Sequence, residues 1–167
     1  MGKELLVIIH NIRSAYNVGS IFRTADGIGA TKIYLTGYAP IPHKKGKILQ
    51  TAAEKMIAKT ALGAEQQLPW EQRKNVVTLI NQLKKKGYTV VALEQSAKSI
   101  HYLEYRPKFP MALILGNEPR GLDRRVLDKC DAIMEIPMFG SKNSLNVAVA
   151  FGVAGYQLVR GCNPVAE

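Results

Sequence analysis

The stretch that decides the fold is Glu135-Ile136-Pro137-Met138-Phe139-Gly140-Ser141-Lys142-Asn143-Ser144-Leu145-Asn146-Val147-Ala148-Val149-Ala150. Residues 132–138 are mostly apolar and predict a short strand. A loop of small polar residues follows, and after it comes a helix that is apolar on almost every face. Outside a membrane, such a helix must be buried in a core or against a partner. We expect Ser144 to be its N-cap and Asn146 to lie in its first turn.

Outward from this stretch, the chain alternates between apolar runs and helical patterns. Residues 5–9, 32–36, 88–93 and 111–115 predict further strands. Helical spacing predicts helices over 48–61, 75–86 and 123–129, and one that begins with Asn17 as its N-cap and is stopped by Gly27 and Gly29. Strands that alternate with helices indicate an α/β fold with a parallel sheet.

Composition narrows the class of protein. A length of 167 residues favours one domain, and a hydrophobic fraction of 47% fits a globular chain. A net charge of +10 favours a polyanionic partner such as nucleic acid, or an anionic membrane; the alternative is a solvated basic surface. The apolar run at 5–9 is too short for a signal peptide or a membrane span. Cys130 and Cys162 lack metal or disulfide spacing, so we expect a cytoplasmic protein without a zinc site.

Two further stretches carry polar groups at places where ligands bind. Residues 115–122 read Leu-Gly-Asn-Glu-Pro-Arg-Gly-Leu and connect a strand to a helix, which is where open α/β sheets bind ligands. Neither GxGxxG nor the P-loop pattern is present, so the turn taken alone is also consistent with a structural connection. Arg23, on the first helix, suits a phosphate ligand, or it extends to solvent.

Taken together and in order, three motifs resemble the SpoU (TrmH-like) family of RNA 2′-O-ribose methyltransferases, in the SPOUT superfamily. The motifs are Asn17-Val18-Gly19-Ser20 with Arg23-Thr24, Gly116-Asn117-Glu118 with Gly121-Leu122, and Ile136-Pro137-Met138 with Ser144-Leu145-Asn146-Val147. The resemblance covers almost the whole chain. Ala148 departs from the pattern, since many members carry a second serine there, and no appended RNA-binding domain is expected.

The resemblance implies a parallel, doubly wound sheet whose C-terminal part forms a deep trefoil knot, within a single domain over residues 1–167. It implies S-adenosylmethionine as the cofactor and a homodimer with the site at its interface. It implies no metal and no membrane partner. The cofactor-binding positions carried over from the family are Leu93, Gly116, Ile136, Ser144 and Leu145.

For the chemistry, the resemblance implies in-line attack of a ribose 2′-hydroxyl on the sulfonium methyl group. An arginine keeps its proton in proteins and is a poor base, so we expect Arg23 to hold a phosphate and stabilise the developing alkoxide. Ser144 and Asn146 would orient Arg23 and the ribose. Glu118 would position Arg23 or another group of the site, and Asn17 would order the loop.

The expected partner is RNA. Basic residues concentrate after the second predicted strand, and we expect them to contact RNA phosphates: Lys44, Lys45, Lys47, Lys55 and Lys59. Transfer RNA is the preferred substrate and ribosomal RNA the alternative. Two other classes remain open, a catalytically silent RNA-binding protein and a nucleotide-binding α/β protein; the missing phosphate-loop patterns disfavour the second.

Overall fold

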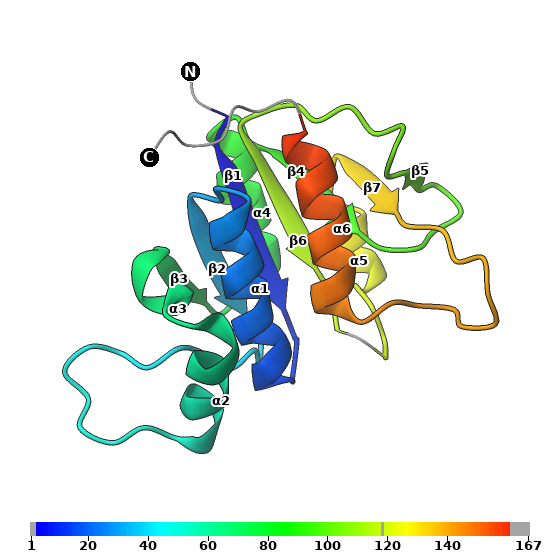
Figure 1. The fold of residues 1–167 in the computed structure, drawn as a ribbon. Coiled ribbons are helices and arrows are strands. Elements are labelled where there is room, and N and C mark those ends of the chain that lie inside the picture. The colour runs from blue at the N-terminus through cyan, green and yellow to red at the C-terminus, as the bar shows by residue number, and fades with distance from the viewer. Residues whose placement is uncertain (1–2, 118, 161–167) are drawn as a thin grey trace.

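A parallel sheet organises the chain (Figure 1). The computed structural model describes residues 3–117 and 119–160, and within them seven strands pair in the order β3-β2-β1-β6-β4-β7-β5. Their bounds are Leu5–His10 (β1), Lys32–Thr36 (β2), Trp70–Arg73 (β3), Thr89–Leu93 (β4), Ile100–His101 (β5), Met111–Leu115 (β6) and Ala132–Glu135 (β7). All the pairings between these strands are parallel, so the carboxyl ends of the strands lie along one edge.

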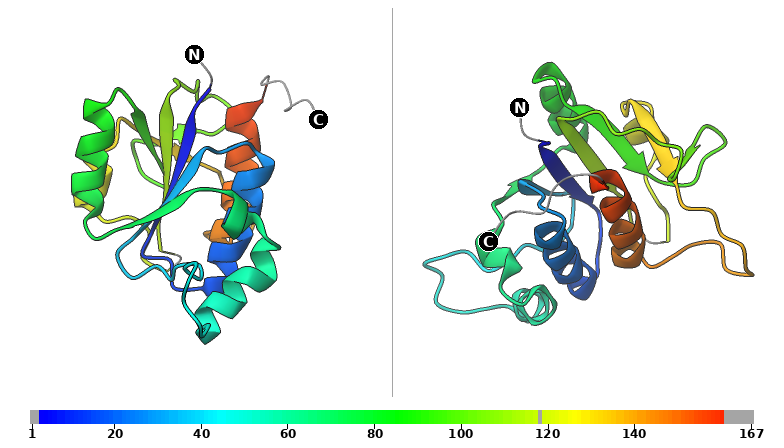
Figure 2. Two further views of the ribbon diagram at one scale, coloured as in Figure 1. Left: turned by 90° about the vertical axis from the view of Figure 1, so that its left-hand side faces the viewer. Right: turned by 45° about the horizontal axis from the view of Figure 1, so that its top comes forward.

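Helices cover both faces of the sheet, as Figure 2 shows most directly. One face carries α1 (Ala15–Gly27), α2 (Ala52–Ala61), α3 (Ala64–Gln67) and α6 (Val147–Val159). The other carries α4 (Val76–Lys85) and α5 (Arg124–Leu127). The central strand β1 is buried along its whole length, because Val7 and Ile9 face the first layer while Leu6 and Ile8 face the second. The doubly wound parallel sheet expected from the sequence is confirmed.

Several element boundaries differ from the sequence-based expectation. The 48–61 helix begins only at Ala52, because Thr51 and Glu54 form a capping box there. The last strand ends at Glu135 and does not continue to 138, shortly before a proline that has no N–H to pair. Three short elements, α3, β3 and β5, were not predicted from the sequence.

Both expected N-caps were also wrong. Helix α1 begins earlier, with Ser14 as the N-cap, and the Ser14 hydroxyl accepts a hydrogen bond from the backbone N–H of Asn17. Helix α6 begins later, with Asn146 as the N-cap in place of Ser144. The Asn146 carboxamide oxygen accepts hydrogen bonds from the N–H groups of Ala148 and Val149, at 2.9 and 3.4 Å.

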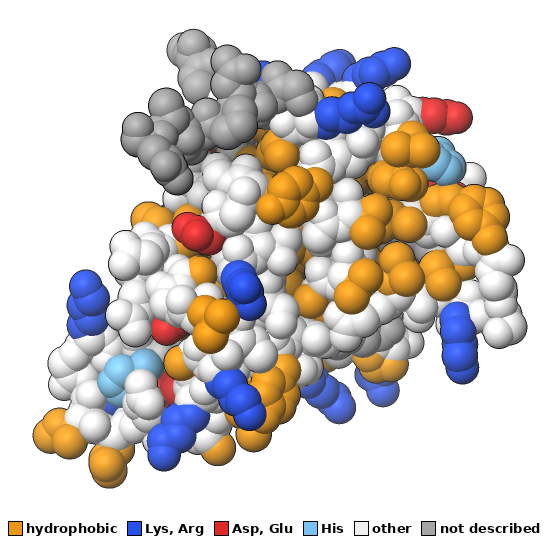
Figure 3. All heavy atoms as spheres, in the orientation of Figure 1, with side chains coloured by type: hydrophobic (Ala, Val, Ile, Leu, Met, Phe, Trp, Pro, Cys, Tyr) orange, Lys and Arg blue, Asp and Glu red, His pale blue; other side chains and the backbone are white. Residues whose placement is uncertain are grey.

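Helix α6 is also less buried than its composition suggested. Phe151, Ala154 and Leu158 pack into the core, whereas Val149 and Tyr156 are more than half exposed. In Figure 3, apolar side chains are exposed along α6 and across the neighbouring part of the same face. This face of α6 is therefore left exposed by the rest of the chain that the structure describes.

Candidate active site

A pocket opens at the carboxyl edge of the sheet, beyond the ends of β4, β6 and β7. It has a volume of about 420 Å³, within the range of small-molecule sites. The strand ends supply its apolar wall through Leu93, Leu115 and Ile136, and Val147 at the start of α6 adds to it. Segments from three distant parts of the chain therefore enclose one cavity: residues 93–95, 115–121 and 135–150.

Glycines let the turn after β6 close tightly around this pocket. A Cβ on Gly116 would lie 2.8 Å from the side chain of Leu122 and 2.9 Å from backbone atoms of Gly121 and Leu122. Gly121 has φ +63 and faces the carboxylate of Glu94, which accepts a hydrogen bond from Leu122 N at 2.9 Å. The other oxygen of Glu94 accepts from the N–H of Gln95, also at 2.9 Å. Glu94 thus holds the β6 turn against the end of β4.

All five residues expected to bind the cofactor line this one pocket. They are Leu93, Gly116, Ile136, Ser144 and Leu145. The structure therefore brings together positions that lie as much as 52 residues apart in the chain, from 93 to 145.

Two of the expected catalytic residues meet beside the pocket. The side-chain amide of Asn146 donates a hydrogen bond to Oδ1 of Asn17 at 3.1 Å, and so joins the third motif to the first. Ser144, two residues before Asn146, lines the pocket. Asn146 therefore caps α6 with its oxygen and holds α1 with its nitrogen. Glu118 lies outside the described residues.

Arg23 stands apart from the pocket of its own chain. It is exposed on α1, does not line the cavity, and within the described residues has no hydrogen bond or ion pair. One turn further along α1, an ideal Cβ on Gly27 would lie 3.2 Å from the hydroxyl of Tyr156. Arg23 therefore lies on α1 one turn before the place where this helix meets Tyr156 of α6.

Residues that the motifs did not single out for a role form a polar network at the same edge. Asn117, only 5% exposed, donates hydrogen bonds to the carbonyl of Asn11 at 2.9 Å and to the Tyr38 hydroxyl at 2.8 Å. Its carboxamide oxygen accepts from the N–H of Arg120 at 3.2 Å. Asn117 belongs to one of the sequence motifs. Its partners Asn11 and Tyr38 lie 106 and 79 positions away, and no sequence pattern marks them as part of the site.

A buried histidine, His10, is hydrogen-bonded to this network through Asn11. Burial lowers the pKa of His10 from its usual 6.5, outweighing the nearby Asp123 carboxylate, so the ring is neutral at pH 7. Thr36 donates to the carbonyl of Ile9, so its hydroxyl is free to accept from Nδ1–H of His10 at 2.8 Å. Nε2 of His10 then accepts from the Asn11 side chain at 3.0 Å. The ring of His10 therefore orients Asn11.

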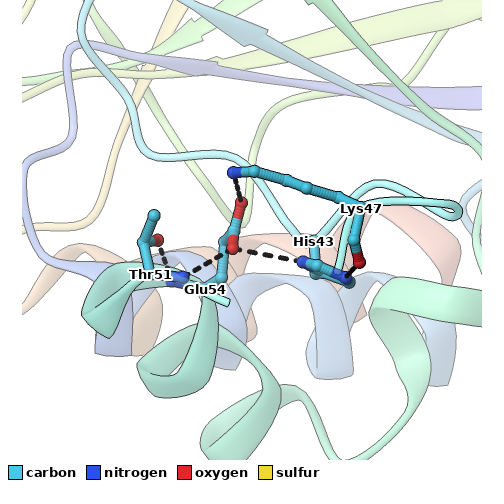
Figure 4. Close-up of polar contacts among 4 residues, drawn as sticks. All are labelled: His43, Lys47, Thr51 and Glu54. Carbon is cyan, nitrogen blue, oxygen red and sulfur yellow. Dashed lines mark hydrogen bonds and ion pairs between the residues drawn. The ribbon is translucent and has the colours of Figure 1, made fainter. Parts of the chain in front are cut away.

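The lysines expected to bind RNA lie on the loop before α2 and on α2 itself. Lys44, Lys45, Lys55 and Lys59 are exposed. Lys47 is exposed as well, but its ammonium group pairs with the buried Glu54 carboxylate, at 3.0 Å (Figure 4).

Glu54 is the point to which this loop is attached. Its carboxylate accepts hydrogen bonds from the backbone N–H of Thr51 and from Lys47, and contacts Nδ1 of His43 at 3.2 Å (Figure 4). These contacts lower the pKa of Glu54 to about 2, and the hydrogen bond from the Thr51 amide has the largest effect. His43 also bonds the carbonyl of Lys47 through Nε2, at 2.9 Å. The loop consequently has a defined shape and presents Lys44 and Lys45 outward.

The described helices include none with the length and apolar character needed to cross a bilayer. The same residues bring together no group of three His, Cys, Asp or Glu side chains that would hold a metal ion.

Together, a doubly wound parallel sheet and a pocket at its carboxyl edge define an α/β protein that binds a small ligand at the strand ends. The family model described as the SpoU rRNA Methylase family matches residues 4–156. The chain therefore belongs to that family.

Known proteins agree with this assignment. The Bacillus subtilis protein YacO, named as a TrmH family tRNA/rRNA methyltransferase, is 34% identical over 165 residues, which are 99% of this chain and 62% of YacO. An S-adenosylmethionine-bound rRNA methyltransferase from Sinorhizobium meliloti superposes with a TM-score of 0.84 at 27% identity, over 98% of this chain and 59% of that one. The chain thus spans about three fifths of the length of these relatives.

A third match is similar in length to this chain. This structure, described as giving insights into the 2-OH methylation of C/U34 on tRNA, superposes with a TM-score of 0.73 at 27% identity. The superposition covers 95% of this chain and 97% of that one.

Proposed function

We propose that this chain transfers a methyl group from S-adenosylmethionine to a ribose 2′-hydroxyl of RNA. One observation carries the proposal: the five cofactor positions implied by the family resemblance line a single pocket at the strand ends. Family membership and the cofactor-bound relative support it.

The pocket fits the cofactor in size and in the chemistry of its walls. About 420 Å³ accommodates a bent nucleoside with an amino-acid tail, and Leu93, Leu115 and Ile136 offer apolar surface for the adenine. Gly116 leaves the backbone close to the ligand. When bound, S-adenosylmethionine supplies a methyl group already activated by its positive sulfur.

The residues beside the pocket then act on the ribose. Asn146 and Ser144 orient the sugar, while Asn17 holds Asn146 in place. Arg23 binds a phosphate next to the target ribose and stabilises the negative charge that develops on the 2′-oxygen as its proton leaves for water. Glu118 positions Arg23.

We further propose a homodimer through the exposed face of α6. Arg23 lies one turn from the contact between α1 and Tyr156 and does not line its own chain's pocket, so we infer that pairing of two chains brings it to a site at the interface. The C-terminal trefoil knot that the family resemblance implies belongs to the same proposal, since the 116–121 and 135–150 segments that enclose the pocket are those the knot would link.

Transfer RNA is the proposed substrate, with Lys44, Lys45, Lys55 and Lys59 on its phosphates and Lys47 holding the loop that presents the first two. The match of similar length, whose description names 2-OH methylation of C/U34 on tRNA, favours tRNA over rRNA. Because RNA is the substrate, we place the reaction in the cytoplasm.

Methyl transfer to separated RNA pools tests the proposal. Labelled S-adenosylmethionine is incubated with total tRNA and, separately, with rRNA, using wild type, Arg23→Ala and Arg125→Ala. Arg125→Ala is a control that removes one positive charge from α5, on the other face of the sheet. We expect wild type to label tRNA and Arg23→Ala to lose about 100-fold or more of this activity. Arg125→Ala should keep the wild-type activity. Absence of both methyl transfer and S-adenosylmethionine binding would favour the silent RNA-binding alternative.

A further inference from the structure

An exposed tyrosine beside the pocket is held by a residue of the pocket wall. Tyr38 follows β2, and 51% of its surface is exposed. Its hydroxyl accepts the 2.8 Å hydrogen bond from Asn117, which is buried and lines the pocket. The Tyr38 side chain is therefore one hydrogen bond away from the proposed cofactor site.

Tyr38 is fixed at its backbone as well as at its hydroxyl. Its backbone N–H donates to Oδ1 of Asn11 at 3.2 Å. Asn11 is itself held by Asn117 and by the neutral ring of His10. Side chains on surface loops usually change rotamer freely, whereas this one is held in a single position by buried polar groups.

One arginine lies over the tyrosine ring, and a second lines the pocket nearby. The guanidinium carbon of Arg13 lies 5.3 Å from the centre of the Tyr38 ring, and Arg13 is exposed. Arg120, which gives its N–H to Asn117, is also exposed and lines the pocket. Aromatic rings and guanidinium planes are the groups on which unpaired RNA bases stack.

We propose that Tyr38 and Arg13 form a nucleobase-binding surface, on which an unpaired base of the RNA stacks so that its ribose faces the pocket. The inference rests on the proposed function and adds the site that positions the target nucleotide. A ring that served only packing would be covered, and the net charge of +10 favours RNA over a protein partner.

Substitutions at Tyr38 separate the ring from its hydrogen bond. Tyr38→Phe and Tyr38→Leu both lose the bond to Asn117, but only Phe keeps an aromatic face. We expect Tyr38→Phe to keep a KM for RNA near that of wild type. Tyr38→Leu should raise it roughly 5- to 100-fold, the range for loss of one stacked base. Arg13→Ala should also raise the KM, whereas the matched charge control Arg125→Ala should not. The Kd for S-adenosylmethionine should be equal in the Phe and Leu variants.

A second measurement does not depend on methyl transfer. A short single-stranded RNA that contains 2-aminopurine reports base stacking by fluorescence quenching. Quenching by wild type and Tyr38→Phe, but not by Tyr38→Leu, supports the surface. Equal quenching by wild type and Tyr38→Leu, or none by wild type, overturns it. If wild type transfers methyl groups and Tyr38→Leu keeps a normal KM, this inference fails while the proposed function stands; if wild type transfers none, the proposed function fails and the quenching still decides.

Discussion

At the scale of single residues, Gly116 shows how a missing side chain shapes the site. An added Cβ would press on backbone atoms of Gly121 and Leu122 at 2.9 Å, which cannot move aside cheaply. We expect Gly116→Ala to weaken S-adenosylmethionine binding about tenfold or more, because the turn must shift into the pocket. Isothermal titration calorimetry measures this, with Gly140→Ala as control, since a Cβ there meets nothing within 4 Å. Equal affinities would show that the turn does not limit the site.

Asn146 caps α6 and has a proposed role in the reaction, and the two can be tested separately. Asn146→Asp keeps the oxygen that caps α6 but loses the N–H that binds Asn17. We expect it to unfold with nearly wild-type free energy yet to transfer methyl groups at least tenfold more slowly. Asn146→Ala should also lose about 1 kcal/mol of stability, the usual contribution of an N-cap. Urea unfolding and turnover measure both; an active Asp variant would refute the role of the Asn17 contact.

Glu54 makes the order of the basic loop dependent on pH. Its pKa is lowered to about 2, so the carboxylate contributes stability that is present above its usual 4.5 and is lost as pH falls towards 2. Wild type should therefore be more stable than Glu54→Gln at pH 7, and the difference should shrink as pH falls below 4.5. Urea unfolding at pH 7, 4 and 3 tests this prediction. A difference that stays constant with pH would mean that ionisation of Glu54 is irrelevant.

At the scale of helices and strands, the contact between α1 and α2 depends on Gly19. A Cβ there would overlap the Thr60 hydroxyl and the Ile57 carbonyl. We expect Gly19→Ala to lower the free energy of unfolding by about 1–3 kcal/mol. In Gly27→Ala the new methyl group meets only the end of the Tyr156 side chain, at 3.2 Å, so this control should cost much less. Thermal unfolding compares them, and equal values would contradict tight α1–α2 packing.

The sequence predicted elements well where local patterns are strong. The strands 32–36 and 111–115 were placed correctly because each is an apolar run with clear ends. The two-residue strand β5 has no such pattern, and its pairing with β7 depends on the rest of the sheet. The caps of α1 and α6 were misplaced because several cap-forming residues stand close together, and only the backbone geometry selects Ser14 and Asn146.

The site was predicted only as far as the motifs reach. The motifs contain four of the five pocket residues, and the family resemblance added Leu93. The surrounding network required the fold, since the Asn117–Tyr38 and Asn17–Asn146 contacts join residues 79 and 129 positions apart. The pairing of Lys47 with Glu54 was likewise invisible to a count of lysines in the loop.

At the scale of the whole molecule, the exposed face of α6 predicts self-association. Val153 lies in this face and is 38% exposed. We expect wild type to sediment as a dimer, and Val153→Asp to sediment as a monomer, because a buried unpaired charge opposes association. Thr78→Asp, on the opposite layer, should remain dimeric. A monomeric wild type would contradict the proposed interface.

The central claim is that the pocket at the strand ends delivers a methyl group to a ribose. Its most direct test uses S-adenosylmethionine with a deuterated methyl group, total tRNA and the wild-type protein, followed by digestion to nucleosides and mass spectrometry. We expect a nucleoside whose three added deuterium atoms remain with the ribose fragment. Gly116→Ala should reduce the yield of this nucleoside. Deuterium on a base fragment, or an undiminished yield from Gly116→Ala, would contradict it.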